Sequence, residues 1–359
     1  MSHAGFNLIG YATSPIGLGE DLRSFAAMLE YLGIPFSIVD VPTDSSNKVP
    51  LSFSHINTES YATSVFFMSA MECQKLARES PRLFSEPKTK IGYFLWELPD
   101  FPDEHVGALK LVDHIWCPSK FVQEAFFAKS KQLILSLPLP VIQAKPSGFS
   151  FRAHLGIPPT AFVALFMFDL RSTLNRKNPQ GALAAFHAFA QGKDDVYFIL
   201  KINRWQQEAA SNLKWLPQHP RIPILSQTLS APQLADLYQA SNCYLSLHRS
   251  EGFGRTLVES LQNGLSLVTT DYSGPADFLT PSNCHLVPWV PKTVLKGDYP
   301  HSHHSMWADP VVSDAAQQLQ EAYGLPRTER NQAGITTGAQ FTLEALAQKY
   351  RPILRSYLR

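Results

Sequence analysis

The sequence predicts an α/β protein of two lobes, each built around a parallel sheet. Short segments rich in β-branched and aromatic residues alternate with helical patterns along almost the whole chain. A proline-rich stretch at residues 137–148 interrupts this alternation once, and the alternation then restarts. Such alternation indicates βαβ units, in which helices cover both faces of a parallel sheet.

The individual elements follow from these patterns. In the first lobe we expect strands at Phe6–Tyr11, Phe36–Val41, Ser64–Met68, Ile91–Trp96 and His114–Pro118, with helices at Leu22–Leu32 and Cys73–Glu79. In the second lobe we expect strands at Phe162–Phe168, Val196–Lys201, Ile222–Leu225, Cys243–Leu247 and Ser266–Thr270, with helices at Gly181–Gln191 and Gln233–Gln239. Pro288–Pro310 is expected to be a long ordered loop, and Thr342–Leu358 a last amphipathic helix.

These elements predict two Rossmann-like lobes that face a cleft, since ligands of open α/β sheets bind beyond the carboxyl ends of the strands. We expect the first lobe at residues 1–145, the second at 146–340, and a C-terminal helix at 341–359 that returns to the first lobe.

Composition limits the possible functions. The formal net charge of the 359 residues is +1, which gives no global electrostatic attraction to nucleic acid or membranes. The four cysteines are scattered, without a CxxC spacing, as expected of small buried residues in a reducing cytosol. The N-terminus lacks the pattern of a signal peptide, and no apolar run approaches the roughly 20 residues of a membrane span. We expect a cytoplasmic protein, at most peripheral to a membrane.

The strongest chemical signal is the segment HRSEGFGRTLVESLQNG at residues 248–264, between a strand and a helix. Gly252 and Gly254 allow a tight turn and a close backbone approach to a ligand. The helix start that follows is suited to binding a phosphate. Glu251 and Glu259 bracket this turn, where carboxylates can accept hydrogen bonds from hydroxyl groups. The alternative is a helix-capping acid and a solvated helix acid.

A second signal follows the strand FVALFMFD. Arg171, Arg176 and Lys177 lie between this strand and the next helix. Guanidinium and ammonium groups there can clamp two phosphates. A solvated basic loop is the alternative.

A third, weaker signal places Gly10, Gly17 and Gly19 between the first strand and a helix that begins near Glu20. This junction does not match G-x-G-x-x-G, so dinucleotide binding is not indicated, and a plain turn is the alternative. The histidines of PHSHHSMW lack a matching acidic or cysteine set for metal binding, and no metal site is expected.

These motifs together resemble a known family. The segment EGFGRTLVE, the spacing of Arg171 and Lys177, and the N-terminal glycine loop resemble retaining family 4 glycosyltransferases of the GT-B fold. The stretches IGYFLWELPDFPDEH, HIWCPSKFVQEAF, SLHRSEGFGRTLVES and YSGPADFL are similar to a branch often seen in bacterial surface-polysaccharide assembly. The likeness covers nearly the whole chain.

The resemblance implies catalytic roles for three residues. Arg171 and Lys177 would neutralise the donor diphosphate, and Glu251 would contact hydroxyl groups of the transferred sugar. Other residues are implied to bind the donor: Gly17, Gly19, Arg176, Gly252, Phe253, Gly254, Thr256, Leu257 and Glu259. Among these, the amides near Thr256 and Leu257 would hold a phosphate, and Glu259 the ribose.

Many relatives have a histidine at a strand end of the first lobe, near the transferred sugar, and this sequence has Trp96 and Glu97 in that region, so Glu97 is a candidate for contact with the acceptor or the sugar. His248 is a second candidate because it directly precedes the segment that contains Glu251. His248 is equally well interpreted as a packed, hydrogen-bonded histidine. Asp271–Asp277 is a weaker candidate for shaping the sugar pocket.

The implied activity is hexosyl transfer from a nucleoside diphosphate sugar, with retention and without a divalent metal or other cofactor. The implied acceptor is a glycan or lipid-linked glycan at the inner face of the membrane. A two-lobed sugar-nucleotide epimerase or phosphorylase, and a non-catalytic module of a glycan-assembly complex, are the alternatives. The sequence does not identify the base, the sugar or the acceptor.

Overall fold

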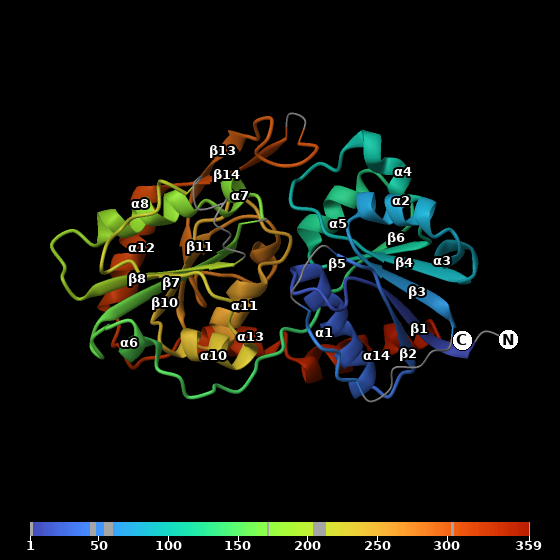
Figure 1. The fold of residues 1–359 in the computed structure, drawn as a ribbon. Coiled ribbons are helices and arrows are strands. Elements are labelled where there is room, and N and C mark those ends of the chain that lie inside the picture. The colour runs from blue at the N-terminus through green and yellow to red at the C-terminus, as the bar shows by residue number, and fades with distance from the viewer. Residues whose placement is uncertain are drawn as a thin grey trace. The chain divides into compact units, whose positions relative to one another are not determined.

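The computed structural model describes residues 3–43, 48–53, 60–170, 172–203, 213–302 and 305–358. The chain forms two compact units (Figure 1). One comprises Met1–Ile142 and Gln340–Arg359, and the other comprises Gln143–Ala339.

The first unit contains a parallel sheet in the order β2-β1-β3-β4-β5-β6. Its strands are β1 (His3–Gly10), β2 (Phe36–Asp40), β3 (Tyr61–Phe67), β4 (Thr89–Tyr93), β5 (His114–Cys117) and β6 (Leu133–Ser136). The patterns above predicted the first five of these. They missed β6, a short edge strand whose Leu133 is half exposed and which therefore lacks a continuous apolar signal.

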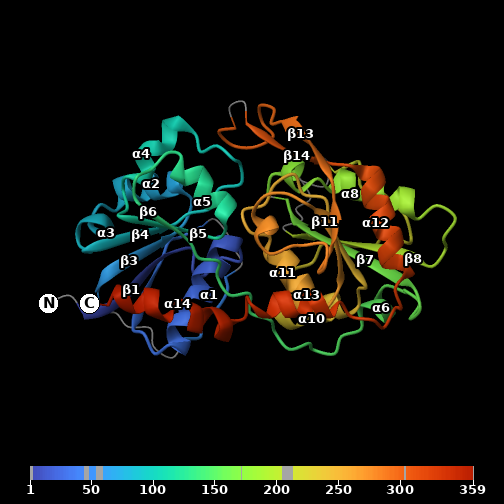
Figure 2. The same ribbon diagram turned by 180° about the vertical axis from the view of Figure 1, so that it is seen from behind.

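Helices cover both faces of this sheet (Figures 1 and 2). They are α1 (Gly17–Tyr31), α2 (Ala70–Glu79), α3 (Arg82–Ser85), α4 (Val106–Leu109), α5 (Lys120–Phe127) and α14 (Leu343–Ser356), with a 3₁₀ turn at Asp103–His105. Neighbouring strand residues point to opposite faces. Thus Phe67 packs against Phe25 of α1 (ring centroids 5.5 Å apart), whereas Phe66 stacks on Phe84 of α3 (4.4 Å).

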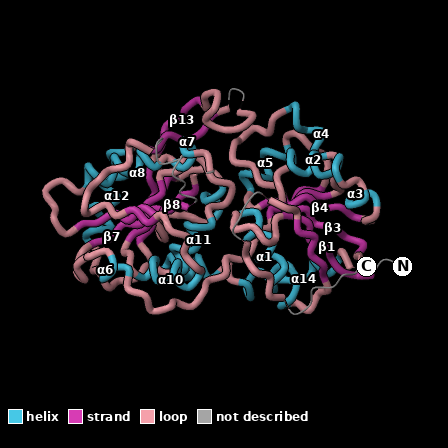
Figure 3. The backbone as a smooth tube through the Cα atoms, in the orientation of Figure 1, coloured by secondary structure: helices cyan, strands magenta, loops and turns pink. Residues whose placement is uncertain are grey.

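The second unit contains a parallel sheet in the order β12-β11-β10-β7-β8-β9, visible as the other group of strands in Figure 3. Its strands are β7 (Phe162–Asp169), β8 (Val196–Asn203), β9 (Ile224–Leu225), β10 (Cys243–Ser246), β11 (Ser266–Thr270) and β12 (His285–Val287). Its helices are α6 (Phe151–His154), α7 (Leu174–Lys177), α8 (Pro179–Phe189), α10 (Ala231–Gln239), α11 (Arg255–Gln262), α12 (Val312–Gly324) and α13 (Gln332–Ala339), with a 3₁₀ turn at Gly274–Asp277.

The core of the second unit has two layers, one on each face of the sheet. Along β7, Phe162, Ala164, Phe166 and Phe168 pack into the layer formed with α8 and α12. Val163, Leu165 and Met167 pack into the layer formed with α6, α10 and α11. Because both faces of β7 are buried, its sequence is apolar throughout, as expected of a central parallel strand.

One expectation was wrong. Pro288–Pro310 is not simply a loop, because β13 (Trp289–Thr293) and β14 (Met306–Pro310) pair as an antiparallel hairpin within it. Prolines at both ends and at Pro291 obscured the strands. Pro291 is tolerated because β13 is an edge strand, whose outer side needs no backbone donor. His303 and His304 lie outside the described residues.

The four cysteines are buried and unbridged, as their scattered spacing predicted. Within the described ranges, no helix combines the length and the apolar character that crossing a membrane requires.

Candidate active site

The candidate site lies where β7 and β10 end side by side in the sheet of the second unit. Because β10 pairs with β7 in parallel, the segments that follow their carboxyl ends meet. Two hydrogen bonds join these segments. Asn178 Nδ2 donates to the Leu247 carbonyl (2.9 Å), and the Arg249 amide donates to the Arg176 carbonyl (2.7 Å). The basic residues that follow β7 and the segment at residues 248–264, both singled out from the sequence, therefore lie together.

Asn178 makes the turn that presents the two basic residues of α7. It is left-handed (φ 52°) and buried, and its Oδ1 accepts from the Gly181 amide (3.2 Å), which caps α8. Asparagine tolerates this conformation better than most residues. The signal was present in the sequence, since Asn before Pro179 is typical of a cap followed by proline at the first helical position.

A buried cluster of charges forms around Glu251. Its Oε2 lies 3.0 Å from Arg176 Nη1, and its Oε1 pairs with Lys177 Nζ. The side chains of Arg176 and Glu251 are 5 % and 9 % exposed, whereas that of Lys177 is 18 % exposed. Arg176 Nη1 also donates to the Ser250 carbonyl (2.9 Å), which fixes the guanidinium. Lys177 is thus the more accessible of the two cations.

The cations keep Glu251 ionised. Burial alone would raise the pKa of this carboxyl group, but Lys177 and Arg176 hold the pKa well below its ordinary value. A carboxylate that is charged at neutral pH can only accept hydrogen bonds.

His248 lies in the same cluster but is fully buried. Its Nδ1 lies 3.2 Å from Ser246 Oγ, and its Nε2 lies 3.4 Å from the Tyr272 carbonyl. Burial lowers the pKa of His248 to about 4, so the imidazole is neutral at neutral pH. These contacts favour the packed role among the two left open by the sequence.

The segment after β11 supports the Glu251 turn. The Glu251 amide donates to Ser273 Oγ (2.8 Å), and the Gly274 amide donates to the Glu251 carbonyl (3.0 Å). A Cβ atom at Gly274 would lie 2.2 Å from the Gly252 carbonyl oxygen, so the two turns can pack this closely only because residue 274 is glycine. Asp271–Asp277 therefore contacts the Glu251 turn directly.

The first turn of α11 begins at Gly254, which is left-handed (φ 88°) as its sequence context suggested. The Leu257 amide donates to the Gly254 carbonyl (2.9 Å). This bond closes the first helical turn. That the amides near Thr256 and Leu257 hold a phosphate stays a prediction.

Glu259 has a partner that the sequence did not reveal. Its Oε2 accepts a hydrogen bond from the hydroxyl of Tyr238 on α10 (2.6 Å). Tyr238 is 3 % exposed and lies in an apolar helical pattern, where a tyrosine is indistinguishable from an ordinary core residue. Only the packing of α10 beside α11 reveals the pair.

Lys201 was also missed as a candidate. It is completely buried near the carboxyl end of β8, and its Nζ donates to Asn203 Oδ1 (2.5 Å). Burial lowers the pKa of Lys201 to about 8, an effect that the carboxylate of Asp169 partly opposes. A lysine inside the apolar run VYFILKIN is the signal that could have identified it.

Four expected site residues lie outside the described part of the second unit. Arg171 lies outside the described residues. Gly17, Gly19 and Glu97 belong to the first unit. There Gly17 and Gly19 form the first turn of α1, and a Cβ atom at Gly19 would lie 2.4 Å from the Ser14 carbonyl oxygen, whereas Gly17 faces open space. Glu97 follows β4 and is half-buried.

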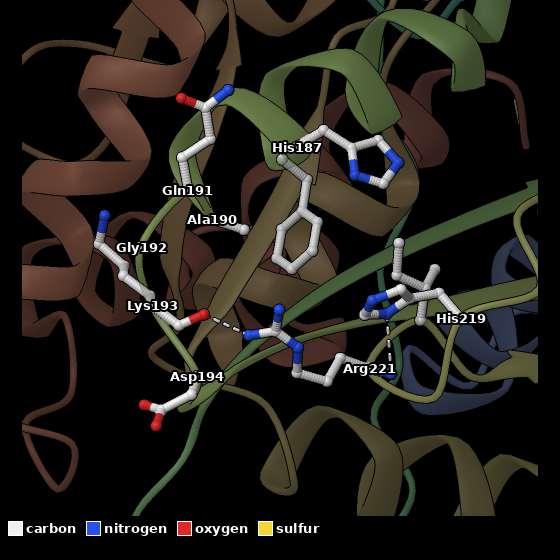
Figure 4. Close-up of a pocket in the computed structure, with 10 residues that line it drawn as sticks. His187, Ala190, Gln191, Gly192, Lys193, Asp194, His219 and Arg221 are labelled. Carbon is white, nitrogen blue, oxygen red and sulfur yellow. Dashed lines mark hydrogen bonds between the residues drawn. The ribbon is translucent and has the colours of Figure 1, made fainter.

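A hollow of about 510 Å³ lies at the other end of the strands of the second sheet, where β8 begins (Figure 4). Its cations have structural partners. Lys193 Nζ donates to the Phe189 carbonyl at the end of α8 (2.7 Å), and Arg221 Nη1 donates to the Lys193 carbonyl. The hollow is therefore separate from the candidate site.

Comparison with known proteins adds an independent finding. Residues 150–287 match the family model described as "Glycosyl transferases group 1". Over 187 residues, 48 % of this chain, the sequence is 27 % identical to the serotype-specific mannosyltransferase WbdA of Escherichia coli. This match spans only 23 % of that relative's own length.

Solved structures also resemble nearly the whole chain, and HepE of Anabaena and a sucrose-phosphate synthase are two examples. HepE of Anabaena, crystallised with UDP and glucose, aligns with a TM-score of 0.67 at 16 % identity, covering 99 % of this chain and 100 % of HepE. Sucrose-phosphate synthase of Thermosynechococcus elongatus aligns with a TM-score of 0.71 at 14 % identity, covering 99 % of both chains. The chain thus has the two-lobed α/β fold of the GT-B type. The resemblance to GT-B glycosyltransferases is confirmed.

Proposed function

We propose that this GT-B chain is a glycosyltransferase that moves a sugar from a nucleoside diphosphate to a hydroxyl group of a glycan or lipid-linked glycan. Residues 150–287, which match group 1 glycosyl transferases, include the whole Glu251 turn and α7. The observation that carries the proposal is the junction of Arg176, Lys177 and Glu251 with the glycine turn that begins α11.

Lys177 is the described cation best suited to bind the donor diphosphate. Its side chain is more exposed than that of Arg176, so an incoming anion would reach its ammonium group first. Glu251 neutralises Lys177 in the structure, and the diphosphate would share this cation. Charge accumulates on the diphosphate as its bond to the sugar breaks, and a fixed cation stabilises that charge. The family resemblance adds Arg171 to this role.

Glu251 would then bind hydroxyl groups of the transferred sugar. Arg176 keeps its own contact with the carboxylate and with the Ser250 carbonyl, so Glu251 stays fixed when Lys177 turns to the diphosphate. The low pKa of Glu251 keeps it a hydrogen-bond acceptor. Gly252, Phe253 and Gly254 would bring backbone close to the sugar, and Glu259 would bind the ribose.

For the chemical step we propose retention of anomeric configuration. The bond between the anomeric carbon and the diphosphate oxygen breaks, and the acceptor oxygen bonds to that carbon on the same face. The proton of the acceptor hydroxyl passes to the departing phosphate. Lys177 and the amino end of α11 supply positive charge, so we propose that no divalent metal is required. A lipid-linked acceptor would place the enzyme at the cytoplasmic face of a membrane.

The first experiment is a thermal-shift screen of UDP-, GDP-, ADP- and CMP-sugars, because a ligand that binds the folded state raises the melting temperature. With the stabilising donor, Lys177→Ala should lower kcat/KM at least 10-fold, the effect of losing one charge-assisted hydrogen bond of about 1.5–3 kcal/mol. Lys145→Ala, at an exposed position of the same unit, should leave kcat/KM unchanged. EDTA should not lower the rate.

The outcomes separate the alternatives. NMR should show the same anomeric configuration in donor and product, and opposite configurations would reject retention. Donor consumption that releases a free epimer or sugar phosphate would indicate an epimerase or phosphorylase. Unchanged glycan synthesis in cells whose only copy carries Lys177→Ala and Glu251→Ala would indicate a non-catalytic module.

A further inference from the structure

The contact between Tyr238 and Glu259 has a fixed direction. Burial, together with the charge of Glu259, raises the pKa of Tyr238 well above its ordinary value, so the phenol keeps its proton. The Tyr238 hydroxyl therefore donates, and Glu259 Oε2 accepts at 2.6 Å. A distance of 2.5–2.7 Å is typical of a hydrogen bond from a hydroxyl group to a carboxylate.

The two residues come from different helices and differ in exposure. Tyr238 lies on α10 and is almost completely buried, with its ring 6.3 Å from that of Tyr244 of β10. Glu259 lies on α11, one turn after the glycine turn, and is half-buried. A rigid, buried donor thus fixes a carboxylate at the surface of the unit, close to the residues proposed to bind the donor.

We propose that Tyr238 is a positioning residue for recognition of the nucleotide ribose. It holds the Glu259 carboxylate in the orientation that accepts hydrogen bonds from the vicinal hydroxyl groups of the ribose. This inference rests on the proposed function, in which Glu259 binds the ribose. Without the phenol hydroxyl, the carboxylate loses this restraint, and part of its binding strength is lost in ordering it again.

A purely structural bond between α10 and α11 would affect stability alone. The positioning role instead predicts a loss of nucleotide affinity that depends on the ribose hydroxyl groups. The test measures, by calorimetry, the dissociation constants of UDP, GDP, ADP and CDP, and then that of the 2′,3′-dideoxy form of the tightest binder. The dissociation constant of the dideoxy form, divided by that of the ribonucleotide, reports how strongly the hydroxyl groups are recognised.

Tyr238→Phe should weaken binding of the ribonucleotide about 10-fold and leave binding of the dideoxy form unchanged, so the ratio falls. In steady-state assays, KM for the donor should rise more than kcat falls. Glu259→Ala should abolish the discrimination, and adding Tyr238→Phe to it should change nothing further. The matched control is Tyr323→Phe. It removes another hydrogen bond from a tyrosine to a carboxylate, that of Tyr323 to Asp195 (3.0 Å), which directly precedes β8. This variant should keep the wild-type ratio.

A wild-type ratio in Tyr238→Phe, or equal weakening of both nucleotides, would overturn the positioning role and leave the proposed function intact. A wild-type protein that binds none of the four nucleotides would overturn both. If Tyr238→Phe does not fold, Tyr238→Met takes its place, since it also fills buried space with an apolar side chain and has no hydroxyl group. It should lower the ratio, and an unchanged ratio would refute the inference.

Discussion

Neutralising Glu251 should cost a large part of the stability of the second unit. The substitution Glu251→Gln keeps the shape of the side chain and removes its charge. Arg176 and Lys177, whose side chains are 5 % and 18 % exposed, then lose their shared counter-ion. Removing one partner of a buried ion pair typically costs about 3–5 kcal/mol, because the remaining charge stays buried without compensation.

The pKa of Glu251 points in the same direction. Lys177 and Arg176 hold this pKa below its ordinary value of 4.5, so the charged carboxylate stabilises the folded state. The folded pKa is below the ordinary value, so this contribution is present above pH 4.5 and is lost as the pH falls from 4.5 towards 2. The wild-type protein should therefore lose stability in that window, and Glu251→Gln should lose less.

Urea unfolding at pH 7, followed by circular dichroism, measures the difference. The matched control is Glu321→Gln, on α12 of the same unit, where a 50 % exposed carboxylate lies 3.6 Å from His285. Exposed pairs contribute about 1 kcal/mol or less, so this variant should unfold close to the wild-type midpoint. If Glu251→Gln unfolds at the same urea concentration as Glu321→Gln, the buried cluster does not stabilise the fold as argued.

Three further predictions concern neighbouring positions. Gly274→Ala should lower the free energy of unfolding in urea by about 1–3 kcal/mol, because its Cβ meets the Gly252 carbonyl. Gly324→Ala, whose Cβ would have no atom within 4 Å, should be neutral or stabilising. Equal urea midpoints for the two variants would contradict the close packing. His248 has a folded pKa of about 4 against 6.5, so stability should fall as the pH drops from 6.5 towards 4, and urea midpoints of His248→Asn should lack that decline. Lys201 has a folded pKa of about 8 against 10.5, so wild-type stability should rise between these values. Lys201→Met should raise the melting temperature at pH 7. A lower melting temperature would show that the buried ammonium group does not destabilise the fold.

The sequence predicted the parts of the fold that depend on local patterns. The continuous apolar run of β7 reflects burial on both faces, and the glycine at position 254 reflects a turn that needs a positive φ. Weak local signals produced the misses. The strand β6 is short and half exposed, and the prolines around β13 and β14 disguised a hairpin.

The candidate site was only partly predictable for the same reason. Glu251, Lys177 and the glycine turn have a sequence signature, so they could be named in advance. Tyr238 could not, because its hydrogen bond to Glu259 depends on how α10 packs beside α11. The contact of His248 with the segment after β11, through the Tyr272 carbonyl, likewise depends on tertiary packing.

The sequence by itself determined where strands end, where the backbone turns tightly, and which charged residues follow those ends. It could do so because hydrophobic periodicity and glycine conformation are local properties. Only the tertiary structure decided that β10 lies beside β7, which brings Arg176 and Lys177 to Glu251 from 75 and 74 positions away in the chain, respectively. It also decided that these charges are buried. Burial and proximity set the ionisation of Glu251 and His248, and both depend on residues distant in the sequence.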